Sequence, residues 1–199
     1  MKENIVDKRL TEFSSMFDFI QTLIIYLTSF LIPTFLGKIL NVLFTTDSVI
    51  ASNSQIIIGS IVNTLLIISA LNLKGWKKIL GVVTMPSIST IVGGYVFKTS
   101  SVYMVYMIPW IWLGNFALIY VYKLFIFGKN RNYLVTSILS ILIKVCIIFI
   151  GFNILKLFGI FPEKIINLLT VSMGIIQLVT ASIGAIIAFG IYKLEKNNN

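Results

Sequence analysis

Three strongly polar side chains, Asn115, Lys144 and Gln177, interrupt stretches of sequence that are otherwise apolar. A lysine at the centre of a bilayer costs roughly 2.5–3.5 kcal/mol on insertion scales, so it persists only where it finds a partner or water. None of the seven acidic residues lies in the middle of an apolar stretch. Three alternatives remain for Lys144: it caps backbone carbonyls, it snorkels toward the cytoplasm, or its counter-charge arrives with an anionic or carbonyl-rich ligand.

The residue types that most catalytic sites need are missing. The chain has no histidine and a single cysteine, Cys146. This excludes a Cys/His zinc site, a Ser-His-Asp triad, a Cys-His pair and an internal disulfide. We therefore expect no enzyme activity, no metal and no cofactor, and a proton relay or sodium site built on acids is not expected.

The composition is that of a membrane protein. Of 199 residues, 57% are hydrophobic and 12% are charged, and the mean hydropathy is +0.97. Ordinary soluble domains are about 45–50% apolar and about 25% charged. We predict an all-α integral membrane protein, a single domain over residues 1–199 with six transmembrane helices and a cytoplasmic or interfacial tail over residues 1–18. The predicted spans are Phe19–Phe44, Gln55–Leu73, Ile79–Phe97, Ser101–Phe127, Tyr133–Phe158 and Ile165–Tyr192.

The distribution of lysine and arginine predicts the orientation. Eleven fall in the two tails and in the loops at 74–78 and 123–131, against three on the other side. The positive-inside rule then places both termini in the cytoplasm, which agrees with an even number of spans. The net charge of +9 is explained by this rule, so nucleic-acid binding is not expected.

The three polar side chains are predicted to meet at one depth. Asn115 and Lys144 lie 14 residues from the outer ends of their spans, and Gln177 lies 14 residues from Glu163, or about 21 Å at 1.5 Å per residue. Helical spacing puts Ser137, Ser140 and Gly151 on the face of Lys144, and small residues from Gly174 to Ala188 on the face of Gln177. Close helix packing is a sufficient reason for the small residues, but it does not explain Gln177.

Two tryptophans, Trp110 and Trp112, lie close to Asn115 in the sequence. Aromatic residues commonly form a belt at the membrane interface, although these two lie deep for that role. The alternative is a stacking wall for a flat ligand, and the sequence leaves both open.

The order of these features resembles the substrate-binding S components of energy-coupling factor (ECF) transporters. The resemblance rests on the size, the six spans, the Pro/Gly-rich third span, the serine-rich fifth span before Lys144, and two runs, Met107–Asn115 and Gly174–Gly184. It implies a prokaryotic plasma-membrane subunit that binds a vitamin or related micronutrient from the outer side. It further implies partners, namely a membrane coupling subunit and two cytoplasmic ATPases, and a site at Trp110, Trp112, Asn115, Lys144 and Gln177.

The resemblance also implies a lid and a docking face. The loop Thr45–Ser54 would cover the site. The Ala-x-x-x-Ala pattern of many members is absent from the first span, where Ser29, Pro33 and Gly37 share its four-residue spacing and take the docking role.

Two other functions compete with substrate binding. The main alternative is a small membrane assembly or regulatory subunit without a ligand, in which Asn115 and Gln177 join helices by hydrogen bonds of about 0.6 kcal/mol. It explains Lys144 poorly. A channel or exchanger would show internal repeats or intramembrane acids, and neither is visible.

Overall fold

The computed structural model describes residues 16–43, 54–94 and 101–197, and every element in these ranges is helical. The predicted lid over 45–53 and residues 1–15 of the predicted tail lie outside the described residues. The elements are α2 (Met16–Leu43), α4 (Ser54–Asn72), α5 (Trp76–Gly93), α6 (Ser101–Met104), the 3₁₀-helix η2 (Val105–Met107), α7 (Ile108–Tyr122), the π-helical η3 (Lys123–Gly128), α8 (Tyr133–Leu157), α9 (Glu163–Met173) and α10 (Ile175–Asn197).

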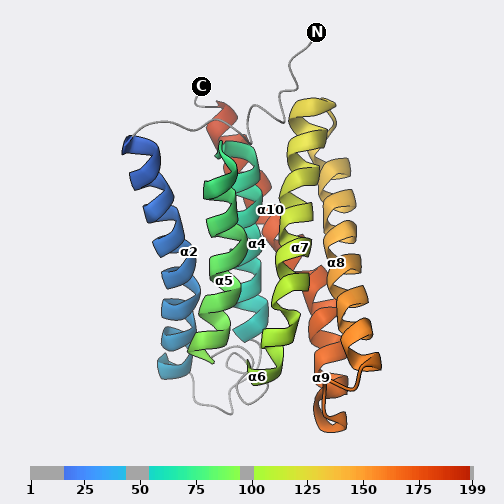
Figure 1. Cartoon of the computed structure of the whole chain (residues 1–199). Coiled ribbons are helices and arrows are strands. Elements are labelled where there is room, and N and C mark those ends of the chain that lie inside the picture. Colours follow the sequence, from blue (N-terminus) through green and yellow to red (C-terminus); the bar gives the residue numbers. More distant parts are fainter. Residues whose placement is uncertain (1–15, 44–53, 95–100, 198–199) are drawn as a thin grey trace.

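The helices form one bundle in which successive segments run in alternate directions (Figure 1). The first turn of α2 and the last turns of α10 lie at the same end of this bundle, which we call the terminal end. The central helix is α4, the most buried of the long apolar helices among the described residues. The opposite end, where α6 and α9 lie, is called the distal end.

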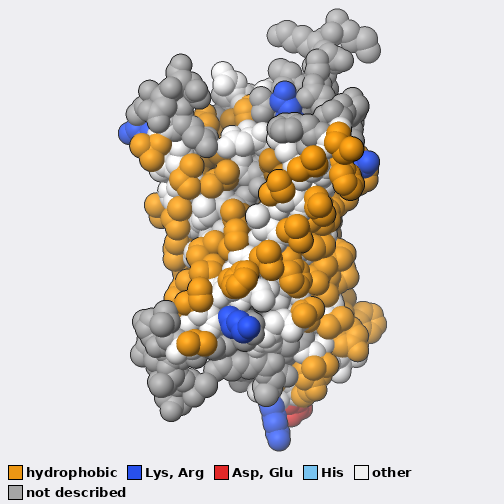
Figure 2. Space-filling view, turned by 90° about the vertical axis from the view of Figure 1, so that its left-hand side faces the viewer, with side chains coloured by type: hydrophobic (Ala, Val, Ile, Leu, Met, Phe, Trp, Pro, Cys, Tyr) orange, Lys and Arg blue, Asp and Glu red, His pale blue; other side chains and the backbone are white. Residues whose placement is uncertain are grey.

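Five helical segments in the described part of the chain are long and apolar enough to cross a membrane: Phe19–Leu40, Ser54–Asn72, Val102–Gly128, Tyr133–Leu157 and Glu163–Leu194. The surface agrees, because apolar side chains cover its middle and the lysines and arginines lie toward the two ends (Figure 2). So large an apolar surface is unusual for a soluble monomer. The chain is therefore an α-helical, multi-pass membrane protein.

The predicted third span, Ile79–Phe97, is the exception to this agreement. Its helix α5 has only 18 residues, begins with Trp76-Lys77-Lys78 and ends where Gly94 adopts a left-handed conformation with φ 65°. It is not among the five apolar segments, although it lies inside the bundle between α2 and α7 (Figure 1). Membrane crossing by this segment therefore stays a prediction.

The last predicted span, Ile165–Tyr192, lies within the apolar segment Glu163–Leu194, but it is not one continuous helix. The structure divides it at Gly174, whose φ of −103° and ψ of −94° end α9 before α10 begins. The amide of Gly174 still donates to the Thr170 carbonyl, and its own carbonyl accepts from Leu178. The helix therefore changes direction at this residue without losing these two bonds.

Close contacts between helices hold the bundle together. The principal pairs are α4 with α10, α2 with α5, and α7 with α8. A Cβ atom on Gly184 of α10 would lie 2.6 Å from Asn63 Cβ in α4, and one on Gly114 of α7 would lie 3.2 Å from the Lys144 carbonyl in α8. Glycines at these positions let the backbones approach, as small residues do in membrane bundles.

Candidate ligand-binding site

A polar cavity lies between the two apolar clusters of the core. Along α8, Ile141 belongs to the cluster nearer the terminal end and Ile148 to the distal cluster, with Lys144 between them. Asn115 of α7 precedes Leu118 of the first cluster, and Gln177 lies between Met173 and Ala181 of the two clusters. The cavity has a volume of about 80 Å³. Its polar side chains come from five helices and are Gln55, Asn63, Ser87, Thr90, Asn115, Lys144 and Gln177.

Lys144 hydrogen-bonds Asn63 of α4. For a lysine without a ligand the sequence predicted either a cap on backbone carbonyls or snorkelling, and this bond is neither. Its side chain is 2% exposed, and its Nζ donates to Asn63 Oδ1 at 2.5 Å. The lysine therefore neither caps a backbone carbonyl nor snorkels out of the bundle. Its partner in the described residues is a neutral amide, so no acidic side chain there pairs with the lysine.

Asn63 is held so that its oxygen faces the lysine. Its Nδ2 donates to the Gly59 carbonyl at 2.8 Å and to Thr180 Oγ1 of α10 at 3.2 Å. The amide of Asn63 cannot be reversed, because Lys144 is a donor and needs the amide oxygen, whereas the Gly59 carbonyl is an acceptor and needs the amide nitrogen. Asn63 thus joins α4, α8 and α10 at the cavity wall.

Asn115 is the one described side chain that has a buried polar atom without a partner. Its Nδ2 donates to the Val83 carbonyl of α5 at 3.3 Å, whereas its Oδ1 has no hydrogen-bond partner among the described residues. The residue is 3% exposed. An unsatisfied buried acceptor costs roughly 1–3 kcal/mol, so this atom calls for an explanation.

Gln177 and Gln55 lie at the break between α9 and α10. Gln177 is half-buried in the first turn of α10, where the helix dipole places partial positive charge. Gln55 Nε2 donates to the Ser172 carbonyl at 3.3 Å, in the last turn of α9. A break in a helix at membrane depth is tolerated where it is buried in protein or lines a cavity, and here glutamines from two helices lie beside it.

The two tryptophans do not line this cavity. Trp112 Nε1 donates to Ser87 Oγ at 2.7 Å, and that hydroxyl donates to the Thr84 carbonyl at 2.8 Å. Trp110 packs on α8, where a Cβ atom on Gly151 would lie 2.2 Å from its ring. The structure therefore brings together Asn115, Lys144 and Gln177 of the five predicted site residues, while Trp112 hydrogen-bonds a lining serine and packs against the apolar core.

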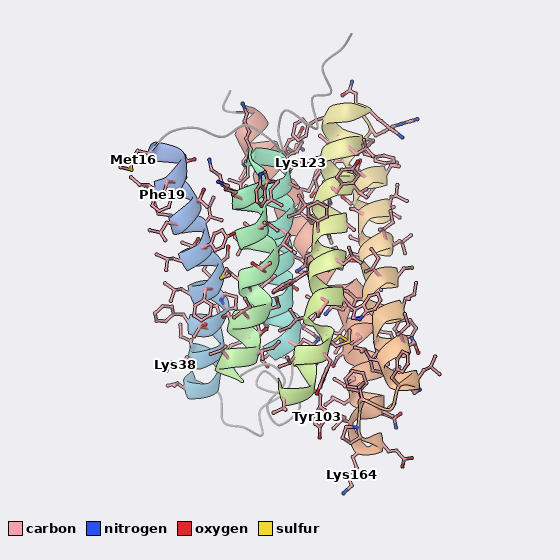
Figure 3. All side chains as sticks on the ribbon, in the orientation of Figure 1. Met16, Phe19, Lys38, Tyr103, Lys123 and Lys164 are labelled. Atoms are coloured by element: carbon pink, nitrogen blue, oxygen red, sulfur yellow. The ribbon has the colours of Figure 1, made fainter. Side chains whose placement is uncertain are left out.

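The predicted docking residues of the first span lie on the inner side of α2. Ser29 is 4% exposed, and Pro33 and Gly37 are also buried. Thr34, on the same helix, hydrogen-bonds Ser89 of α5. The exposed side of α2 is the opposite one, where Phe19 and Lys38 point away from the bundle (Figure 3). In this arrangement Ser29 and Gly37 are covered by the chain itself, so they are corrected from a docking face to an internal contact.

Asn63 is the site residue that the sequence prediction missed. A signal was present, because Asn63 is an amide in the middle of the apolar stretch Gln55–Leu73, like Asn115 in its own span. Lys123, which the sequence placed among the basic residues of the cytoplasmic side, is fully buried, and its Nζ donates to the Leu73 carbonyl beyond the end of α4.

No protein-family model, no curated protein sequence and no solved structure matches the chain. The argument for a function therefore rests on the cavity and the bundle.

Proposed function

We propose that the chain is the substrate-binding S component of an ECF-type importer, with six spans and both termini in the cytoplasm. It binds a vitamin-like or other micronutrient molecule from the outer side, and a membrane coupling subunit with two cytoplasmic ATPases drives the uptake. The observation that carries this proposal is the incompletely satisfied polar cavity inside an apolar bundle, with Lys144 and Asn115 in its wall. The ECF assignment itself rests on the sequence resemblance.

If the buried polar residues served only to join helices, an unsatisfied amide oxygen such as Asn115 Oδ1 would lower stability without any benefit. Buried polar groups in a finished packing interface are almost always paired, and an unpaired one lowers stability. The combination of a buried lysine, an unpartnered amide oxygen and a cavity that both residues line is instead what a site prepared for a ligand requires. Functional sites are where proteins retain such unfavourable arrangements.

The size of the cavity limits how the ligand sits. A volume of about 80 Å³ is well below the roughly 300–1,000 Å³ of pockets that enclose a drug-sized molecule. In this form of the protein a vitamin-sized molecule would insert only one polar end. The remainder of the ligand would lie toward the distal end.

The direction of access follows from the charge on the two ends of the bundle. Arg131 and Lys193 are exposed near the terminal end, which favours a cytoplasmic position for that end. The distal end is then outside. Gln177 lies 14 residues beyond the start of α9 at Glu163, or about 21 Å, so the site is within reach of the outer surface.

The competing function is a membrane assembly or regulatory subunit without a ligand. Two observations favour it: Lys144 already has a partner in Asn63, and Ser29 and Gly37 offer no exposed docking face. In that case the polar residues serve only to join α4, α7, α8 and α10. This alternative leaves the free Asn115 oxygen unexplained.

The two functions are separated by releasing small molecules from the full chain after gentle detergent purification from rich medium and identifying them by mass spectrometry. We expect a stoichiometric compound from the wild type and from Lys38→Met, whose lysine lies exposed on α2. Lys144→Met and Gln177→Leu should lose it while retaining the helical circular dichroism and the elution volume of the wild type. Gln177→Leu matters because no hydrogen bond of its side chain is seen in the described residues, so packing is little affected.

The result that would overturn the proposal is the absence of any small molecule from wild-type protein prepared from several media. The assembly-subunit function would then be preferred. Co-purification of two ATPases with the tagged chain, and its loss on deleting the coupling subunit, would test the ECF assignment separately from ligand binding.

A further inference from the structure

One residue of the cavity wall, Asn115, has a buried hydrogen-bond acceptor without a donor among the described residues. Asn115 Oδ1 has no partner in the described part of the chain, and the residue lines the cavity. The orientation of its amide is fixed by the Val83 carbonyl 3.3 Å from Nδ2, because the reversed amide would set two carbonyl oxygens against each other. A group that fills the cavity must therefore bring an N–H or O–H to this oxygen.

The same cavity presents a donor that is only partly used. A lysine amino group has two N–H donors when neutral and three when protonated, and the bond to Asn63 Oδ1 accounts for one of them. Lys144 lines the cavity as well, so its remaining donors call for an acceptor oxygen there. The wall thus requires an acceptor and a donor together.

The small volume of the cavity implies that the acceptor for Lys144 and the donor for Asn115 belong to one chemical group of the ligand. About 80 Å³ holds a few waters or one small polar group, but not two separate parts of a large molecule. We propose that the ligand of this cavity inserts a single group that carries a carbonyl or carboxylate oxygen for Lys144 next to an N–H or O–H for Asn115, as a lactam, a cyclic urea or an imide does. This proposal rests on the binding function proposed above and names its substrate class.

Water and simple anions compete with such a ligand for the cavity, and they form different hydrogen bonds with its wall. A water that bridged Lys144 and Asn115 would satisfy both, so a ligand that displaced it would gain only by reproducing both bonds. An acceptor-only group leaves Asn115 Oδ1 unpaired against another oxygen. From the cost of one unsatisfied buried acceptor, such a group should bind about five- to 150-fold more weakly than one with the adjacent donor.

Three probes of similar size test this on the wild-type full-length chain in detergent micelles. 2-Pyrrolidinone carries the carbonyl and the N–H, cyclopentanone carries the carbonyl alone, and acetate is an anionic acceptor. Binding is followed at millimolar concentrations by saturation-transfer NMR. We expect 2-pyrrolidinone to bind at least about fivefold more tightly than cyclopentanone or acetate.

Asn115→Leu should remove this preference and leave 2-pyrrolidinone and cyclopentanone equal. The matched control is Asn153→Leu on α8, because the Asn153 amide bonds only the Phe149 carbonyl of its own helix, and we expect it to keep the preference. The comparison of the three probes on the wild type requires no variant, so it decides the matter even if Asn115→Leu does not fold.

Equal or tighter binding of cyclopentanone or acetate, or no binding of 2-pyrrolidinone, overturns the inference. A natural compound that is released from the protein but has no N–H or O–H beside its oxygen overturns it too, while the binding function stands. If no natural compound is released and no probe binds, the binding function fails together with the inference.

Discussion

The contact between α10 and α4 at Gly184 provides a sharp test of the bundle. A Cβ atom on Gly184 would lie 2.6 Å from Asn63 Cβ and 2.9 Å from the Thr64 backbone nitrogen. Carbon atoms in contact are normally about 3.5–4.0 Å apart, so alanine at this position must push α10 about 1 Å away from α4. The obstacle includes backbone, which cannot swing aside as a flexible side chain can.

The magnitude follows from a comparison with Gly190, which lies in the same helix and has nothing within 4 Å of its would-be Cβ. Glycine to alanine in a helix interior gains about 1 kcal/mol of helix propensity at either position. That gain cancels in the comparison, and the overpacking cost of about 1–3 kcal/mol remains. Gly184→Ala should therefore unfold at a temperature about 2–12 °C below that of Gly190→Ala, from the scaling for a chain of this length.

The assay is thermal unfolding of both variants and the wild type in the same detergent, followed by far-ultraviolet circular dichroism at one heating rate. A Gly184→Ala protein as stable as Gly190→Ala would refute the close approach of α10 to α4. A further consequence can be checked in the same preparations, because displacement of Asn63 weakens its bond to Lys144. Ligand release, measured as above, should fall in Gly184→Ala and stay unchanged in Gly190→Ala.

Three other predictions follow from single contacts. Asn63→Leu leaves the buried Lys144 side chain without its amide partner and should lower the free energy of unfolding by about 3 kcal/mol. The double variant Asn63→Leu/Lys144→Met should recover most of this loss. Equal stability of the single and double variants in detergent unfolding would contradict this pairing. Trp112→Phe keeps an aromatic ring but loses the bond to Ser87 and should cost about 1 kcal/mol in the same assay, and a loss above about 3 kcal/mol would mean that the ring itself carries the packing. Cys146 faces outward from α8 and should react slowly with a charged maleimide in intact membranes; labelling as fast as that of a cysteine placed at the exposed Arg131, measured by mass shift, would show that this face of α8 is in water.

The helices themselves were predictable because long apolar runs leave few alternatives. The fifth span was predicted as Tyr133–Phe158, and α8 covers Tyr133–Leu157. Its start is fixed locally, since the Asn132 side chain accepts from the Leu134 amide. Helical spacing also identified the buried face of α8, where Ser140 and Lys144 are both buried.

The break at Gly174 was not predictable from the same pattern. Glycine is common inside transmembrane helices, and the apolar run continues on both sides of it. Whether the helix bends there depends on neighbours that can satisfy the freed backbone groups, such as the Gln55 amide from α4. That neighbour comes from a residue more than a hundred positions away in the sequence.

Asn63 was missed because the helices are staggered. Counted from the start of its span at Gln55, it lies about 12 Å deep, not the 21 Å obtained for Lys144. In the structure α9 extends beyond the ends of α4 and α5, so equal counts from span ends do not mean equal depths (Figure 1). The spacing of small residues in the first span failed for a related reason. It marks a close approach, but it does not say that the neighbour is α5 of the same chain.

To distinguish a binding subunit from an assembly subunit without a ligand, a test needs a residue that contributes to ligand binding but not to the joining of helices. Lys144, Asn63 and Thr180 form a network that joins three helices, so the loss of any of them disturbs packing and binding together. Asn115 differs, because its Nδ2 hydrogen-bonds α5 while its Oδ1 accepts no hydrogen bond in the described residues. Leucine there removes an unsatisfied acceptor, which should leave stability unchanged or higher if the oxygen serves only a ligand. A marked loss of stability would instead mean that the oxygen has a structural partner, and the case for a prepared site would fail with it.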